Sequence, residues 1–178
     1  MGLISTPNAR AVGEVSTTAK KPTFFVNGGY GLLENKPYTA RFGYAQAQLI
    51  YPLADWALKN TLKNVSLIYL DFSSGHDTAS AFTTAFTAGG GKISGDVAVP
   101  SNATDFSAYI QRLRDSKPQA VFMFLTSQSP EFLKQWRNAV GPHSEIKLLG
   151  TAETNELELP VLGDDASTPT RRCRSCAA

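Results

Sequence analysis

The sequence has few cysteines, no long apolar run and, over most of its length, no excess of charge of either sign. Only two of its 178 residues are cysteines, and both lie among the last eight positions. A structural zinc site needs four ligands, so Cys173 and Cys176 alone do not predict a metal site. No apolar stretch approaches the ~18–20 residues that a membrane-spanning helix needs. We therefore expect neither a metal centre nor a membrane span.

The formal charge of +2 comes from the end of the chain. Arg171, Arg172 and Arg174 belong to the last eight residues, and without positions 171–178 there are 14 basic against 15 acidic residues. This balance gives no reason to expect a nucleic-acid partner. We interpret residues 164–178 as a disordered tail, although redox or metal chemistry at the Cys-x-x-Cys pair remains an alternative.

Helical and strand patterns alternate along the chain. Apolar residues recur at helical spacing in five segments, 9–19, 44–62, 76–88, 105–113 and 130–136. Short apolar runs predict five strands, 23–26, 65–70, 92–99, 120–125 and 146–149. Strands that alternate with helices form right-handed β-α-β crossovers. The predicted fold class is therefore α/β, a parallel sheet flanked by helices.

Several residues set the expected limits and faces of these helices. Gly89-Gly90-Gly91 reads as a helix stop rather than a phosphate loop, because it follows a helix and enters a strand. Asp105 suits a helix N-cap, and Pro130 suits a first turn. Two inward-facing stripes are predicted, Ala9, Val12, Val15 and Ala19 in the first helix and Leu49, Leu53, Trp56 and Ala57 in the second.

A search for catalytic groups finds no complete set. No Gly-x-Gly-x-x-Gly or Gly-x-Ser-x-Gly motif occurs, and the only histidines are His76 and His143. A metal or general-base role for His76 is open, but we favour a solvent-facing residue in a first helical turn. Glu153, Glu156 and Glu158 could bind a cation, although a solvated face is the better interpretation. We expect no enzyme, no catalytic residues and no cofactor.

Polar loops follow the predicted strands. They occupy residues 27–30, 71–75, 126–129 and 150–153, and they carry hydroxyl, amide and glycine residues. Because the carboxyl ends of parallel strands meet at one edge of a sheet, these loops can converge on a small polar ligand. The alternative is that short polar loops are simply ordinary connections between helices and strands.

The order of motifs between Asn64 and Gly150 matches a known family. The motifs are Asp71 and Ser74-Gly75 after a strand, Gly90-Gly91-Lys92, Asp105-Phe106-Ser107, Lys117 to Val121, Phe132 to Trp136, and Leu148-Leu149-Gly150. In these features the segment resembles the second lobe of type I periplasmic solute-binding proteins, the leucine/isoleucine/valine-binding receptors of ABC transporters. Upstream, Pro37-Tyr38 and Arg41 are similar to the crossover between the lobes.

The resemblance implies a receptor whose two lobes close on a small solute in the periplasm or another extracytoplasmic space. Its partners would be an amino-acid-like or other small polar or aromatic ligand and an ABC permease, with no nucleic acid. It also implies the ligand-binding residues: Gly28, Gly29 and Tyr30 in the first lobe and Ser74, Gln128, Thr151 and Glu153 in the second. Glycine N–H groups would hold a carboxylate, and Glu153 a ligand ammonium.

The chain also departs from the family pattern. Family members commonly carry an aromatic residue where this chain has Ser74, and its loss weakens the expectation of branched-chain amino acids. Family members are also much longer and begin with a signal, for which Met1 to Ile4 lacks the pattern. We therefore expect a fragment: residues 1–40 as the end of the first lobe and the crossover, 41–163 as the second lobe, and 164–178 as the tail.

Two alternatives remain open at this point. A ligand-sensing regulatory module could use the same fold, and an inactive truncated product could show the same motifs. In the expected fragment, exposed strand edges would invite self-association.

Overall fold

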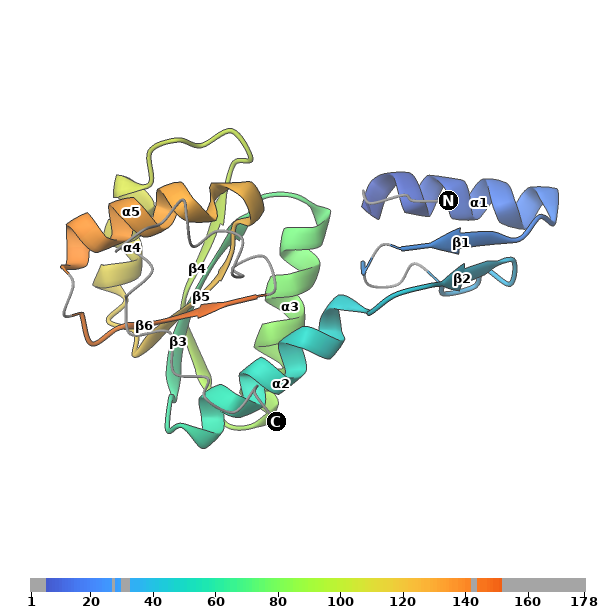
Figure 1. Cartoon of the computed structure of the whole chain (residues 1–178). Coiled ribbons are helices and arrows are strands. Elements are labelled where there is room, and N and C mark those ends of the chain that lie inside the picture. Colours follow the sequence, from blue (N-terminus) through green and yellow to red (C-terminus); the bar gives the residue numbers. More distant parts are fainter. Residues whose placement is uncertain (1–5, 27, 30–32, 142–143, 152–178) are drawn as a thin grey trace.

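A computed structural model describes residues 6–26, 28–29, 33–141 and 144–151, which form two bodies (Figure 1). The N-terminal body contains α1 (Thr6–Ala19), β1 (Thr23–Phe25) and β2 (Thr39–Arg41). The C-terminal body contains α2 (Gln46–Lys59), β3 (Asn64–Leu70), α3 (Ser73–Ala88), β4 (Lys92–Val99), α4 (Ser107–Asp115), β5 (Ala120–Phe124), the 3₁₀ turn η1 (Thr126–Gln128), α5 (Ser129–Val140) and β6 (Lys147–Gly150).

The C-terminal body is built on a four-stranded parallel sheet in the order β4-β3-β5-β6. Helices α2 and α3 cover one face, where Phe82 and Phe122 stack with ring centroids 4.3 Å apart. Helices α4 and α5 cover the other face, where Phe132 and Trp136 are fully buried. This arrangement confirms the predicted fold class, a parallel α/β sheet flanked by helices.

Strand β3 lies inside this sheet and is buried on both faces from Val65 to Leu70. Leu67 and Tyr69 face the α2–α3 layer, and Ile68 and Leu70 face the α4–α5 layer. The polar exception, Ser66, is fully buried and lies 2.8 and 2.7 Å from the hydroxyls of Ser94 and Ser116. A buried hydroxyl costs little when it is hydrogen-bonded in this way.

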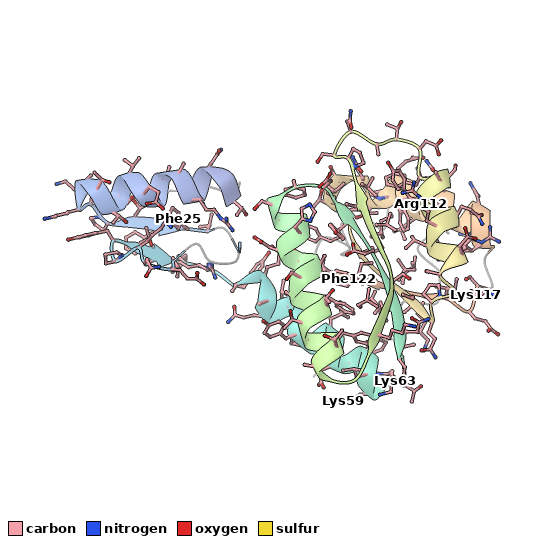
Figure 2. All side chains as sticks on the ribbon, turned by 180° about the vertical axis from the view of Figure 1, so that it is seen from behind. Phe25, Lys59, Lys63, Arg112, Lys117 and Phe122 are labelled. Carbon is pink, nitrogen blue, oxygen red and sulfur yellow. The ribbon has the colours of Figure 1, made fainter. Side chains whose placement is uncertain are left out.

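The N-terminal body is much smaller. Strands β1 and β2 pair in parallel, and Ala9 and Val12 of α1 pack against the fully buried Phe25 of β1 (Figure 2). Strand β2 was not predicted. Val15, predicted to face inward, is 66% exposed, because the described residues provide no second layer over that side of α1.

Most other local predictions are confirmed, with shifts of a few residues. In α2 the buried stripe is Ile50, Ala54 and Ala57, so the prediction for Leu49, which is 38% exposed, was wrong. Asp105 lies one residue before the N-cap of α4, where its carboxylate accepts a hydrogen bond from the Ser107 N–H at 2.9 Å. Hydrogen bonds from the Ser107 side chain and from its backbone N–H lower the pKa of Asp105.

The glycine run ends α3 as expected. The Gly91 N–H donates to the carbonyl of Phe86 at 2.9 Å, and Gly90 has a φ of +82°. A left-handed residue at this place suits glycine because it carries no Cβ. The chain can therefore turn directly into β4.

Gly75 brings the start of α3 close to the end of β3. A Cβ at this position would lie 1.9 Å from the carbonyl oxygen of Leu70. We therefore expect Gly75→Ala to lower the free energy of unfolding by about 2–3 kcal/mol in urea titrations. Ser80→Ala, on the exposed side of the same helix, should change it by less than about 0.5 kcal/mol. Equal stability of the two variants would contradict this account of the packing.

Candidate functional site

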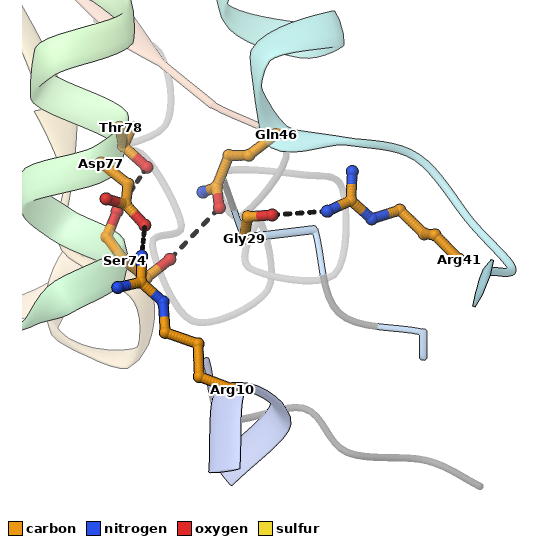
Figure 3. Close-up of polar contacts among 7 residues, drawn as sticks. All are labelled: Arg10, Gly29, Arg41, Gln46, Ser74, Asp77 and Thr78. Atoms are coloured by element: carbon orange, nitrogen blue, oxygen red, sulfur yellow. Dashed lines mark hydrogen bonds and ion pairs between the residues drawn. The ribbon is translucent and has the colours of Figure 1, made fainter. Parts of the chain in front are cut away.

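The two bodies meet where the loop after β1 faces the start of α3 (Figure 3). Gln46, the first residue of α2, contacts both sides of this junction. Its backbone N–H donates to the carbonyl of Gly28 at 2.8 Å, and its side-chain Oε1 accepts a hydrogen bond from Ser74 Oγ at 3.2 Å. One residue therefore connects the glycine loop of the N-terminal body with the first turn of α3.

The start of α3 is fixed from behind by β3 and β4. The Asp71 N–H donates to the carbonyl of Val99 at 2.7 Å, and Phe72 then adopts an extended conformation as the N-cap. Within the helix, Thr78 Oγ1 donates to the Ser74 carbonyl at 2.7 Å. The N-cap side chain makes no hydrogen bond to the first turn. Because the N-terminus of a helix carries partial positive charge, this turn favours a nearby anion.

Charged side chains surround the same junction. Arg10 of α1 lies 3.8 Å from Asp77 of α3, an ion pair that joins the two bodies (Figure 3). Arg41, at the end of β2, donates from Nη2 to the carbonyl of Gly29. No ion pair involves Arg41 among the described residues. Its guanidinium group therefore has no carboxylate within ion-pair distance in that part of the chain.

A small cavity of about 40 Å³ lies beside the junction. Its walls come from both bodies and from the segment that joins them, with Gly28 and Arg41 on one side and Asp77 and Ala81 on the other. It has room for roughly one water molecule, whereas ligand pockets usually measure about 300–1,000 Å³. We conclude that this cavity belongs to the joint between the bodies and does not hold an organic ligand in this arrangement.

The structure brings some of the expected ligand-binding residues together. Gly28 and Ser74 both contact Gln46, and Gly29 lies at the same junction. Gln128 and Thr151 follow β5 and β6, so they lie at the same edge of the sheet as Ser74. The Gln128 side chain donates from Nε2 to the carbonyl of Ser101, while its Oε1 is buried without a hydrogen bond.

Other predicted residues lie outside the described part of the chain. These are Tyr30, His143, Glu153, Glu156, Glu158 and the two cysteines of the tail. Their predicted roles stay predictions.

His76 occupies the first turn of α3 with its side chain about half exposed, as favoured from the sequence. Its Nε2 lies 2.7 Å from Oδ1 of Asp71, a partner that the sequence analysis did not identify. The imidazole also meets the Tyr69 ring edge-on, with centroids 5.2 Å apart. Within the described residues, no group of three His, Cys, Asp or Glu side chains could hold a metal ion.

Sequence reasoning did not identify three residues of the junction, Arg10, Gln46 and Asp77. Arg10 and Asp77 are far apart in the chain, and their contact arises only when α1 approaches α3. Asp77 directly follows His76 in a segment that was already of interest, but no local pattern marks it as a partner of Arg10.

In the described helices, none combines the length and apolar character needed to cross a membrane.

The amino-acid sequence of this chain is similar to those of known proteins. A family model described as "Periplasmic binding protein" matches residues 1–169. The chain is 32% identical over 169 residues to the Leu/Ile/Val-binding protein homolog 6 of Brucella suis biovar 1. That match covers 93% of this chain and 43% of the relative, so this chain spans less than half the relative's length.

Solved structures of similar proteins include two ABC-transporter solute-binding proteins of Rhodopseudomonas palustris. The first, from R. palustris, is in complex with 4-hydroxybenzoate. It is 32% identical to this chain, the TM-score is 0.83, and the match covers 92% of this chain and 45% of that chain. The second, from strain BisB5, is in complex with 3,4-dihydroxybenzoic acid. It is 34% identical to this chain, the TM-score is 0.81, and the match covers 93% of this chain and 46% of that chain.

The ionisation of Tyr69 can be used to test the packing at the carboxyl end of β3, next to the junction. Burial, together with the nearby Asp96 and Asp71 carboxylates, raises the pKa of Tyr69 from 10.0 to about 12. Its contribution to stability is therefore complete below pH 10 and is lost as the pH rises toward 12. We expect ultraviolet titration to show one of the six tyrosines ionising near pH 12, and this component should be absent from Tyr69→Phe. Ionisation of all tyrosines near pH 10 would contradict the packing of Tyr69.

Proposed function

The chain belongs to the periplasmic binding protein family, and from this premise we propose that it binds a small organic acid for an ABC importer outside the cytoplasm. Its relatives are named as solute-binding proteins of ABC transporters, which supports a role in binding rather than catalysis. We propose that residues 1–40 are the end of one lobe and the crossover, and that residues 41–163 form the second lobe, with Arg41, the last residue of β2, at the boundary between them. The ligand would bind where the two meet.

We propose an aromatic carboxylate of the benzoate class as the ligand. The observation that carries this is the likeness, at 30–34% identity, to three solute-binding proteins whose structures contain hydroxylated benzoates. Two structures of proteins named for branched-chain amino acid transport share only 20–21% identity, a level that supports the fold alone.

The charges of the junction agree with an anionic ligand. Asp77 lies 3.8 Å from Arg10, with its Oδ2 buried and making no hydrogen bond, and Asp71 lies 2.7 Å from His76. Arg41 contacts a neutral carbonyl and retains its charge. A benzoate has a carboxylate but no ammonium group, so it could use this positive charge and the N-terminus of α3 without needing a further acidic residue.

The proposed ligand-binding residues keep the roles expected from the sequence. Gly28, Gly29 and Tyr30 would form one wall, and Ser74, Gln128, Thr151 and Glu153 the other. Ser74 is the best placed of the described residues, because its hydroxyl lies at the junction and contacts Gln46. Gln128 would have to exchange its contact with the Ser101 carbonyl before its amide could donate to a ligand.

The Arg10–Asp77 ion pair would favour the arrangement in which the two bodies lie together. The Arg10 side chain is half exposed, and such pairs typically contribute about 0–1 kcal/mol. A contribution of this size is suited to a joint that has to open and close, since it biases the closed arrangement without locking it.

A branched-chain amino acid is the second candidate ligand. It is favoured by the 32% identity to a protein named as a Leu/Ile/Val-binding protein homolog. Its ammonium group would need a carboxylate, for which Glu153 is the residue proposed from the sequence. The two candidates therefore differ in whether the ligand's recognition depends on an acidic side chain.

Calorimetric titration of the chain distinguishes these candidates. We expect 4-hydroxybenzoate and 3,4-dihydroxybenzoate to give saturable heats, because their carboxylates meet Arg41 and the start of α3. Leucine, isoleucine and valine should give only heats of dilution. Saturation by the amino acids alone would favour the second candidate, and no saturation by any of these compounds would overturn the proposed binding role.

Two variants of α3 provide a matched control for this titration. Ser74→Ala removes a hydroxyl from the junction and should weaken benzoate binding roughly 5-fold, the usual effect of one lost hydrogen bond. Ser80→Ala removes a hydroxyl from the exposed side of the same helix and should leave the affinity unchanged. Equal affinities of the two variants would exclude Ser74 from the site.

A further inference from the structure

The end of the C-terminal body opposite the junction carries a row of lysines. Each strand of the parallel sheet begins at or just after a lysine, and in spatial order these are Lys92 of β4, Lys63 before β3, Lys117 before β5 and Lys147 of β6. We call these four residues the lysine row. All four are exposed.

Backbone and amide hydrogen bonds fix the lysine row. The Lys92 N–H donates to the carbonyl of Lys63 at 2.8 Å, and the Asn64 side chain donates to the carbonyl of Lys117 at 3.1 Å. Gln119 connects the starts of β3 and β6. Its Oε1 accepts a hydrogen bond from the Lys63 N–H at 2.7 Å, and its backbone carbonyl accepts one from the Lys147 N–H at 3.1 Å. Neighbouring strands lie ~4.8 Å apart, so the row extends over roughly 14 Å.

The charges of the row are not neutralised within the described chain. No ion pair involves any of its four lysines among the described residues, and nearby Lys59 is already paired with Asp55 at 2.6 Å. The nearest carboxylates in sequence are Asp115 and Glu145, and the Asp115 side chain accepts a hydrogen bond from Gln111. Cations therefore outnumber carboxylates at this end of the described chain. Figure 2 labels Lys59, Lys63 and Lys117 at this end of the C-terminal body.

An apolar groove of about 370 Å³ adjoins the row. It lies between α2 and α3. Tyr51, Leu58, Ala85 and Ala88 contribute to its walls, together with Asp55, whose carboxylate is paired with Lys59. Leu58 directly precedes Lys59, so the groove and the basic end are continuous along α2. The Tyr51 side chain is 47% exposed beside it. A half-exposed tyrosine on the wall of a groove suits the boundary between lipid headgroups and acyl chains.

We propose that the lysine row and this groove form a docking surface for an anionic phospholipid bilayer. A row of separate, strongly hydrated ammonium groups matches a spread of phosphate headgroups better than a single small anion, which would need a closed site. Nucleic-acid sites more often use arginine and stacked aromatic residues. The surface would hold the receptor beside the membrane that contains its permease, so this inference rests in part on the proposed function.

Cosedimentation with lipid vesicles tests the surface without any solute ligand. The full chain should bind phosphatidylcholine vesicles that contain about one third phosphatidylglycerol, and should not bind pure phosphatidylcholine. Binding should weaken as salt rises from roughly 50 to 300 mM, because screening shortens the reach of the lysine charges. Since the titration with benzoates uses no vesicles, failure of one proposal can be told from failure of the other.

Two double variants locate the effect. Lys63→Gln with Lys92→Gln should reduce binding roughly 30-fold, since one lysine near an anionic surface contributes roughly 5-fold. Lys20→Gln with Lys21→Gln removes the same charge from the exposed turn after α1 and keeps the arginines of residues 171–174, so it should have little effect. Equal losses in the two variants, no binding to the anionic vesicles, or complete competition by glycerol phosphate would each overturn the proposal.

Discussion

The candidate site depends on the two hydrogen bonds of Gln46. Its N–H holds the carbonyl of Gly28, and its side chain accepts from Ser74, so the loop after β1 and the first turn of α3 face each other at a defined distance. The Arg10–Asp77 pair adds a second contact across the same joint. These polar contacts supplement the covalent connection between the small core around Phe25 and the larger sheet, which runs through the chain that leads into α2.

The parallel sheet gives the C-terminal body two chemically different ends. All carboxyl ends point to one edge, where Ser74, Gln128 and Thr151 follow their strands. All amino ends point to the other edge, where the lysine row begins the strands. One topological rule thus separates a proposed ligand-binding edge from a proposed membrane-docking edge. The buried strand β3, with apolar layers on both faces, keeps the two edges in a fixed relation.

The sequence predicted the elements that carry a strong periodicity. The apolar run from Val65 to Leu70 required cover on both faces, and the structure shows that cover. Strand β2 escaped prediction because Thr39 to Arg41 has no apolar pattern and is defined only by pairing with β1. The inward stripe of α2 was misplaced at Leu49, since Leu49 and Ile50 fit the period almost equally well and tertiary packing selects Ile50.

The site was less predictable than the fold, for a physical reason. Strand-end positions such as Ser74 follow from the β-α-β order, whereas the contact between Arg10 and Asp77 depends on how two separate bodies meet. Gln46 carries no signal in its local sequence, because its partners, Gly28 and Ser74, lie on opposite sides of it in the chain. The roles of such residues can be identified only from the three-dimensional contact between the two bodies.

The most direct test of the account is residue-level NMR of the chain during titration with 4-hydroxybenzoate. The account predicts saturable changes in amide chemical shift at Gly28, Gly29, Gln46 and Ser74, with the lysine row unaffected. Shifts confined to the groove between α2 and α3, or the absence of shifts at the junction when the ligand is in large excess, would contradict it.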